Sequence, residues 1–207
     1  MNRIVLSVLI AFFSFAFTFA QEGKTSFLEL TLGRNIHGAG DIPGYQYGFH
    51  YGQEFSNKLF WQVGLEGTLN DKVDFPLTYE DPNGNVIDAS LHTVTAGFQL
   101  VSGIRYAIIK SNRHEVSLSA LPLFRYQATS LSGLYDTLFP EITGLPFPVR
   151  NIVRTEPGRT FAVGGSIRVQ YNYEITNDFY IGVFGAFQGD TNGDSIPLYS
   201  LSFGKRF

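Results

Sequence analysis

Apolar and polar side chains alternate one by one along most of the chain after residue 25, which is the pattern of strands with one apolar and one polar face. Beyond the N-terminal segment, no stretch shows the 3.6-residue period of an amphipathic helix. The pattern predicts eight strands, at about 26–34, 45–53, 59–70, 92–106, 115–128, 160–174, 179–189 and 197–207.

The connections between these strands alternate in length. Short ones are expected near 54–58, 107–114 and 175–178, longer ones near 35–44, 71–91 and 129–159, and a compact one at 190–196. Short turns at one end and long loops at the other are typical of membrane barrels whose short turns face the periplasm. The predicted fold class is therefore all-β, an eight-stranded antiparallel up-and-down transmembrane β-barrel.

Side-chain bulk predicts which face of each strand points outward. A soluble ligand-binding barrel would turn its apolar face inward, but the interior of an eight-stranded barrel holds only side chains or one small ligand. The apolar sets here are full of Phe, Tyr and Leu and would overfill it, whereas the polar sets, rich in Gly, Ser, Thr and Gln, would fit. We expect the apolar faces to contact lipid and the polar faces to line the lumen.

Aromatic rings fall toward both ends of the expected strands, where membrane barrels carry interfacial girdles. Strand propensity explains the presence of these rings but not their placement. On the short-turn side the predicted girdle comprises Tyr51, Trp61, Tyr106, Tyr171 and Phe179.

Several charged residues are assigned to the polar, lumenal faces. An unpaired buried ion is strongly destabilising, so each is expected to have an opposite charge or a hydrogen-bonded network beside it. A structural plug of ion pairs is favoured over an ion or proton pathway, because eight strands leave little bore. The predicted lumen network comprises Glu29, Glu66, Arg105, Arg125, Arg168 and Arg206, with His50 and Glu174 as further members.

The N-terminal segment has one cation, Arg3, followed by the apolar run 4–20. This arrangement is typical of a secretory signal peptide cleaved after Ala20. A membrane anchor is the alternative, but the run is at the short limit for a spanning helix and no basic stop-transfer sequence follows. The predicted organisation is a signal peptide at 1–20 and one barrel domain at 21–207.

Composition narrows the class of protein further. The chain has no Cys, which excludes disulfides and a lipidated Cys anchor. Without Arg3 it has 15 − 1 = 14 basic and 18 acidic residues, so no basic face recommends nucleic acid as a partner. Charged residues make up 16% of the chain, against about 25% in typical soluble domains.

The last strand carries its alternation to the final residue. Tyr199, Leu201, Phe203 and Phe207 occupy one face of it. With this C-terminus and the strand pattern, the whole mature chain resembles the small bacterial outer-membrane β-barrel family of the OmpA/OmpX type. The resemblance implies location in the outer membrane, contact with its lipids, and an insertion signal made by these four residues and read by the outer-membrane insertion machinery. Lys205 stands where the family usually has an apolar residue, and a Lys at the membrane edge can snorkel to water.

Two loops have informative sequences. The segment 79–87 predicts a hairpin tip in which Gly84 supplies positive φ. The long loop 129–159 is rich in apolar residues and proline, unlike a solvated loop. Either it packs on itself as a cap over the barrel mouth, which is favoured, or it offers an apolar surface to an extracellular partner or ligand.

The oxygen side chains of 190–194 invite a calcium-loop interpretation, but Ser195 and Leu201 stand where an EF-hand loop needs Gly and Glu. Asn192-Gly193 between two alternating segments instead predicts a type I′ hairpin turn. No metal and no cofactor are expected.

Chemistry by this chain would need a nucleophile and a base at the membrane surface. His37 lies in the first loop and His92 lies near Asp88 and Ser90, but no motif supports catalysis. We expect an outer-membrane protein with a structural or surface-interaction role through its extracellular loops, chiefly 129–159, and no enzymatic activity. The alternatives are a narrow porin-like channel or small apolar-ligand carrier, and then a lipid-modifying enzyme.

Overall fold

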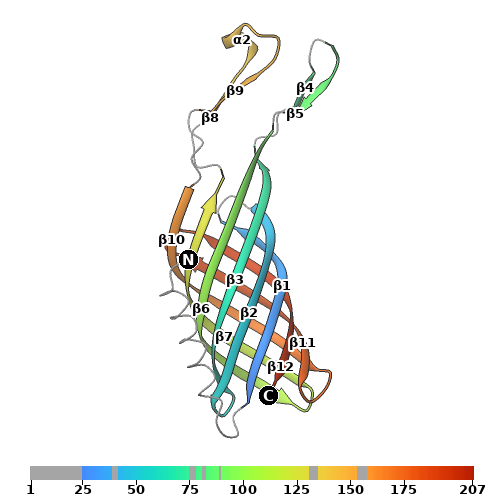
Figure 1. The fold of residues 1–207 in the computed structure, drawn as a ribbon, viewed down its shortest axis with the longest axis vertical. Coiled ribbons are helices and arrows are strands. Elements are labelled where there is room, and N and C mark those ends of the chain that lie inside the picture. Colours follow the sequence, from blue (N-terminus) through green and yellow to red (C-terminus); the bar gives the residue numbers. More distant parts are fainter. Residues whose placement is uncertain are drawn as a thin grey trace, which may run out of the picture.

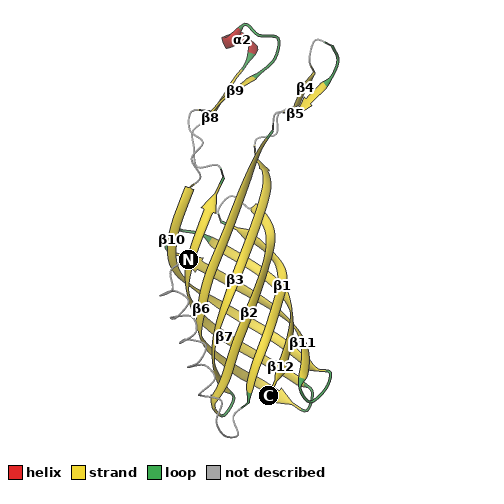
Figure 2. Cartoon of the chain, viewed as in Figure 1, coloured by secondary structure: helices red, strands yellow, loops and turns green. Residues whose placement is uncertain are grey.

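The computed structural model describes residues 25–38, 42–74, 78–80, 83–88, 90–130, 135–152 and 158–207. The predicted signal peptide, 1–20, lies outside this part of the chain. Eight long strands pair antiparallel and close into a barrel in the order β1-β12-β11-β10-β7-β6-β3-β2, as Figures 1 and 2 show. They are β1 (Ser26–His37), β2 (Ile42–Ser56), β3 (Leu59–Asp74), β6 (Leu91–Ser111), β7 (His114–Thr129), β10 (Gly158–Glu174), β11 (Phe179–Asp190) and β12 (Ser195–Arg206).

The fold class is the predicted one, and each predicted strand is present. Most strands are longer than the sequence pattern predicts, because backbone pairing continues into residues that break the apolar and polar alternation. The turn between β2 and β3 is reduced to residues 57–58, where Lys58 adopts a φ of 63°. Register shifts between Glu54 and Ser56, and between Ala107 and Ile109, mark the same end of the barrel. No helix in the described part of the chain is long and apolar enough to span a membrane.

The barrel closes where the first strand meets the last. Ser26 N donates to Phe207 O at 2.8 Å, and Phe207 N donates to Ser26 O at 3.0 Å. Because β1 pairs with β2 on one side and with β12 on the other, neither the first nor the last strand of the barrel has an open edge. Closure of this kind satisfies backbone groups that hydrocarbon could not.

Residues that face one another across successive strands give the stagger of the barrel. From Arg34 on β1, stepping through β2, β3, β6 and β7 leads to Arg159 on β10. Stepping the other way through β12 and β11 leads to Val169 on the same strand. The offset, 169 − 159, gives a shear of 10 residues. Eight strands staggered in this way are strongly tilted and enclose a bore that side chains can fill.

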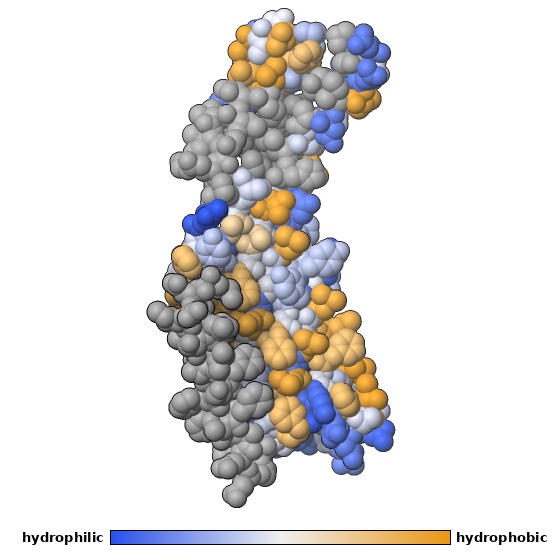
Figure 3. Space-filling model, in the orientation of Figure 1, coloured by the Kyte–Doolittle hydropathy of each residue, from blue (hydrophilic) through white to orange (hydrophobic). Residues whose placement is uncertain are grey.

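The two faces of the wall differ as predicted. On β1 the outward side chains Leu30 and Leu32 are 58% and 61% exposed, whereas the adjacent residues Glu29 and Thr31 are buried. Figure 3 shows apolar residues spread over the lower part of the barrel wall. The prediction that the apolar faces point outward is confirmed, and this exterior suits a lipid bilayer and not water.

Glycines on the inner face make room for rings in the lumen. A Cβ added to Gly204 would lie 2.0 Å from the Tyr180 ring, and one added to Gly64 would lie 2.2 Å from His50. Neither approach is sterically allowed, so a larger residue at either position would force the facing ring to move.

Two hairpin arms rise above the end that carries the long loops (Figure 1). One is β4 (Thr78–Glu80) paired with β5 (Val86–Asp88), which confirms the predicted hairpin, with Gly84 at a φ of 82°. The other is β8 (Tyr135–Leu138), α2 (Pro140–Thr143) and β9 (Val149–Ile152). The favoured prediction of a cap over the mouth is wrong, since this second arm stands off from the barrel and α2 has no buried residue.

The predicted type I′ turn at Asn192-Gly193 is also wrong. Only Gly193 has a positive φ, 81°, and a type I′ turn needs two such residues. Gly193 N donates to Asp190 O, and Asp190 N donates to Asp194 O. This is a three-residue loop ending in a left-handed Gly, and the Asp190 side chain favours it by accepting the Asn192 N–H at 3.0 Å.

Candidate functional site

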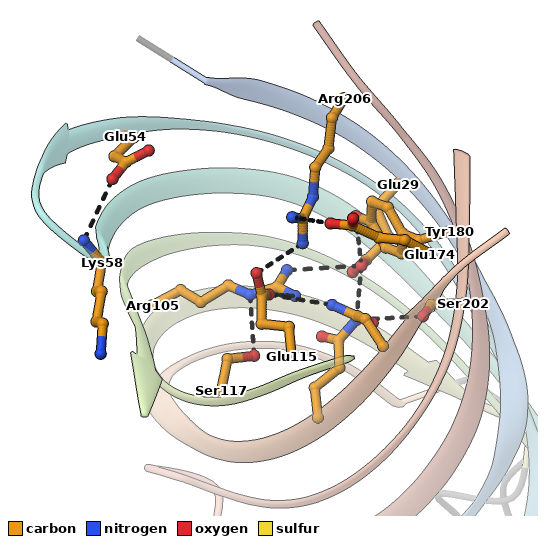
Figure 4. A network of polar contacts seen from close by, with 12 residues as sticks. Glu29, Glu54, Lys58, Arg105, Glu115, Ser117, Glu174, Tyr180, Ser202 and Arg206 are labelled. Carbon is orange, nitrogen blue, oxygen red and sulfur yellow. Dashed lines mark hydrogen bonds and ion pairs between the residues drawn. The ribbon is translucent and has the colours of Figure 1, made fainter. Parts of the chain in front are cut away.

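The lumen contains a ladder of alternating charges at its short-turn end, seen in Figure 4. Arg206 contacts Glu174 at 2.5 Å and Glu115 at 2.6 Å. Arg105 continues the ladder, with Nη2 3.2 Å from Glu115 and Nη1 3.5 Å from Glu29. We call Glu29, Arg105, Glu115, Glu174 and Arg206 the lower network. Because the ladder joins β1, β6, β7, β10 and β12, it crosses the bore from wall to wall.

Neutral donors complete the inner end of this ladder. Glu29 Oε2 accepts hydrogen bonds from Tyr180 Oη at 2.9 Å and from Gln170 Nε2 at 2.6 Å. Arg105 Nε donates to Ser117 Oγ at 3.0 Å. The buried carboxylate therefore has several donors beside its ion pair, which is what a stable buried charge requires.

A second cluster fills the middle of the bore. Glu66 accepts from Arg168 Nη2 at 2.6 Å and from Gln99 Nε2 at 2.6 Å, and its Oε1 lies 3.2 Å from His50 Nε2. Gln99 also donates to Gln188 Oε1 at 2.9 Å. We call these five residues the middle network. It joins β2, β3, β6, β10 and β11, so it too spans the bore.

A third cluster lies at the long-loop end and is built around Arg125. This guanidinium is 0% exposed and donates to Gln127 Oε1 at 3.0 Å, Gln99 Oε1 at 3.3 Å and Thr68 Oγ1 at 3.0 Å. Gln127 in turn donates to Asp194 Oδ2 at 3.0 Å. His37 Nε2 lies 3.2 Å from Gln127 Oε1. We call His37, Arg125, Gln127 and Asp194 the upper network. No described carboxylate lies within ion-pair distance of Arg125, so neutral oxygens hold this buried cation.

Some interior polar atoms have no hydrogen-bond partner within the described part of the chain. Both polar atoms of the Gln46 side chain, with the hydroxyls of Thr31 and Ser200, have no hydrogen bond from the described residues. Buried polar groups of this kind ordinarily bind water. The three networks cross-link the wall, and the polar atoms without partners could each bind a single water molecule inside the barrel.

The structure places all six predicted lumen residues inside the barrel. Glu29 and Arg105 meet in the lower network with Arg206, and Glu66 and Arg168 meet in the middle one. Arg125 forms no ion pair with the described carboxylates, and its hydrogen bond to Gln99 Oε1 links it to the middle network.

Sequence reasoning missed Glu115, which joins Arg105 to Arg206. Its sequence signal was its place two residues before Ser117, on the polar face of the same strand. Glu115 is the first residue of the strand predicted at 115–128, beside the expected connection 107–114, and the pairing that begins at His114 brings it into the wall.

The five predicted girdle residues lie on the outer face near the short-turn end. The rings of Tyr51 and Trp61 meet edge to face at 5.4 Å. Tyr171 Oη lies 2.8 Å from His114 Nδ1. Phe179 lies beneath Lys205, whose Nζ is 5.5 Å from the ring centre. These rings and polar tips match an interface between hydrocarbon and water.

The four residues of the predicted insertion signal share the outer face of the chain's last strand. Tyr199, Leu201, Phe203 and Phe207 are all exposed to the exterior. Their recognition by insertion machinery stays a prediction. Lys205 lies on the same face, and its contact with the Phe179 ring shows how the wall accommodates a cation there.

The histidines considered for catalysis are differently placed. His37 is only 5% exposed, at the end of β1, with Nε2 3.2 Å from Gln127 Oε1 and 3.5 Å from Asp194 Oδ2. The side chain of His92 lies outside the described residues. Within the described part of the chain, no group of three His, Cys, Asp or Glu side chains could hold a metal ion.

The arm formed by β8, α2 and β9 carries apolar side chains at its tip. Ile142 is 72% exposed, and Phe139 and Leu145 beside it are also exposed. Gly144, at a φ of 67°, ends α2 by donating its N–H to Pro140 O. Figure 3 shows this apolar tip at the top of the molecule.

Comparisons with known proteins show similarity in fold. No protein-family model and no curated protein matches the chain. Among solved structures, Neisserial surface protein A is 13% identical, with a TM-score of 0.53, and the match covers 89% of this chain and 98% of that one. Ail, the attachment invasion locus protein of Yersinia pestis, solved with the heparin analogue sucrose octasulfate, is 12% identical, with a TM-score of 0.51, covering 90% and 100%. The chain therefore has the fold of the small outer-membrane β-barrels.

Proposed function

We propose that this chain is a closed outer-membrane barrel that serves as a scaffold for surface contact, made chiefly by the arm at 135–152, and that it performs no chemistry. The observation that carries the proposal is the exposed apolar tip of that arm, held away from a lumen that three polar networks obstruct. Binding residues are commonly found on loops presented by a rigid scaffold.

The partner best suited to the tip is apolar. Phe139, Ile142 and Leu145 form the exposed surface, and one carboxylate, Glu141, lies among them. Ail has been solved with a polysulfated ligand, whose recognition calls for cations. The loop at 71–90 of this chain has five acidic residues and one Lys, which disfavours such a ligand here. The supported ligand class is an apolar surface on a protein or a lipid.

Ile142→Asp tests this proposal in the full-length chain reconstituted into vesicles. The matched control is Val86→Asp, which places the same charge at an exposed apolar position, 70% exposed, on the other arm. Vesicles carrying the wild-type chain or the control should be retained on octyl-coated beads, and vesicles carrying Ile142→Asp should be lost from them. Equal retention of all three would contradict a contact role for this tip.

The alternative of a narrow channel or small-ligand carrier draws support from the interior polar atoms of Gln46, Thr31 and Ser200, which have no hydrogen-bond partner among the described residues. The cross-bore ion pairs oppose it, because a conducting path would have to break them. A lipid-modifying enzyme is less well supported. His37, the described base candidate, is buried and contacts Gln127 and Asp194 instead of facing the membrane.

A further inference from the structure

One cation interrupts the apolar exterior of β1. The outward side chains of this strand are Leu28, Leu30, Leu32, Arg34 and Ile36. Arg34 is exposed, with Leu32 one step below it on the outer face and Ile36 one step above. It is therefore a positive charge set into the lipid-facing wall, toward the end that carries the long loops.

Two tyrosines flank this cation on the neighbouring strands. Arg34 is directly opposite Tyr45 on β2 and Tyr199 on β12, and all three side chains are exposed on the outer face. Arg34 Nη1 donates to Tyr45 Oη at 3.0 Å, and its guanidinium carbon lies 4.5 Å from the centre of the Tyr45 ring. Tyr45 thus fixes the guanidinium against the wall.

No residue in the described part of the chain balances the charge of Arg34. No described carboxylate lies within ion-pair distance of it, in contrast to the paired Arg105, Arg168 and Arg206 of the lumen. A guanidinium has five N–H donors, and Tyr45 takes one of them. The remaining donors belong to an exposed side chain that lies between Tyr45 and Tyr199, and tyrosines on a barrel exterior are enriched where lipid headgroups begin.

We propose that Arg34, oriented by Tyr45 and flanked by Tyr199, binds the phosphate of an outer-leaflet lipid. A guanidinium fork matches a phosphate with two parallel hydrogen bonds, and the tyrosine hydroxyl beside it is a further donor. Leu32, one step below Arg34 on the outer face, contacts acyl chains, so the site takes a phosphate that is attached to a lipid. Tyr45 is a positioning residue, since it also holds the cation in place.

The test uses the full-length chain folded in uncharged detergent micelles, with native mass spectrometry as the readout of bound lipid. The probes are a bis-phosphorylated glucosamine disaccharide lipid, the same lipid without its phosphates, and inorganic phosphate as a competitor. Arg34→Gln should weaken binding of the phosphorylated lipid about tenfold, as expected for a lost charge-assisted pair. It should leave binding of the dephosphorylated lipid unchanged. Tyr45→Phe should weaken phosphorylated-lipid binding by a smaller factor.

Lys205→Gln is the matched control, because Lys205 is an outward cation beside an aromatic ring at the opposite rim. It should leave binding of the phosphorylated lipid unchanged. Equal binding by Arg34→Gln and the wild type would overturn the proposal, as would an equal loss in Lys205→Gln, which would indicate general charge attraction. Full displacement of the lipid by millimolar inorganic phosphate would overturn the assignment to a lipid. Heat-modifiable electrophoretic migration verifies that each variant is folded.

Discussion

Arg168 Nη2 donates to Glu66 Oε1 at 2.6 Å across the lumen, although the two residues are 102 positions apart in the sequence. Glu66 is on β3 and Arg168 is on β10, and two strands of the wall, β6 and β7, separate them. The pair therefore joins parts of the wall that share no backbone hydrogen bonds. Cross-links of this kind fill the bore and fix its cross-section.

Glu66→Gln should lower the free energy of unfolding by about 3 kcal/mol, because it leaves the buried Arg168 without its counter-charge. Urea unfolding in vesicles, followed by tryptophan fluorescence, measures the loss. Ser119→Ala is the control, since the Ser119 hydroxyl is buried but has no hydrogen-bond partner among the described residues. A loss below about 1 kcal/mol in Glu66→Gln would show that the middle network is not a structural cross-link.

Gly193→Ala should destabilise the barrel by about 1 kcal/mol, because Gly193 adopts a φ of 81° that Ala tolerates poorly. Gly189→Ala is the matched control in the same hairpin, as a Cβ there would meet no atom within 4 Å and the backbone has no positive φ. The same unfolding measurement compares the two. A Gly193 variant as stable as the Gly189 variant would contradict the observed turn.

Trp61 is the single tryptophan of the chain, so its fluorescence reports on one site of the predicted girdle at the short-turn end. In vesicles, lipids brominated near the headgroup should quench it more strongly than lipids brominated near the acyl-chain end. Tyr106→Trp in a Trp61→Phe background should give the same depth profile, as both rings lie in the same girdle. Stronger quenching from the bilayer centre would contradict the girdle assignment.

Phe207→Ala should slow assembly of the barrel into outer membranes, because the terminal ring belongs to the predicted insertion signal. The backbone of Phe207 also closes the seam with Ser26, but alanine keeps those hydrogen bonds. The measurement is the fraction of chain that acquires heat-modifiable migration in cells. Phe179→Ala removes a girdle ring outside the signal and should assemble normally, so equal slowing in both variants would argue against a terminal signal.

The fold was largely predictable because period-two alternation fixes both the strands and their faces. Leu30 and Leu32 point outward and Glu29 points inward for one reason, the two-residue repeat of an extended chain. Ion-pair partners were not predictable, since they depend on the stagger of strands distant in the sequence. Glu66 meets Arg168 only because of the register that the closed barrel sets.

The loops were the least predictable part, for a related reason. Apolar residues in 129–159 permit either a packed cap or an exposed arm, and alternation does not distinguish them. Turn chemistry was misjudged at Asn192, where the Asp190 carboxylate accepts the backbone N–H and selects a different turn. Each lumen charge was expected to have either a counter-charge or a hydrogen-bonded network, and the sequence did not show that Arg125 has the network, made by neutral amide and hydroxyl oxygens.

A closed lumen that supports a contact arm is the central claim, and conductance across a planar bilayer tests it most directly. The wild-type chain should give no stable unit openings, because the lower and middle networks cross the bore with ion pairs of 2.5 to 3.5 Å. Reproducible unit openings by the wild-type chain would contradict a sealed barrel and would favour the narrow channel.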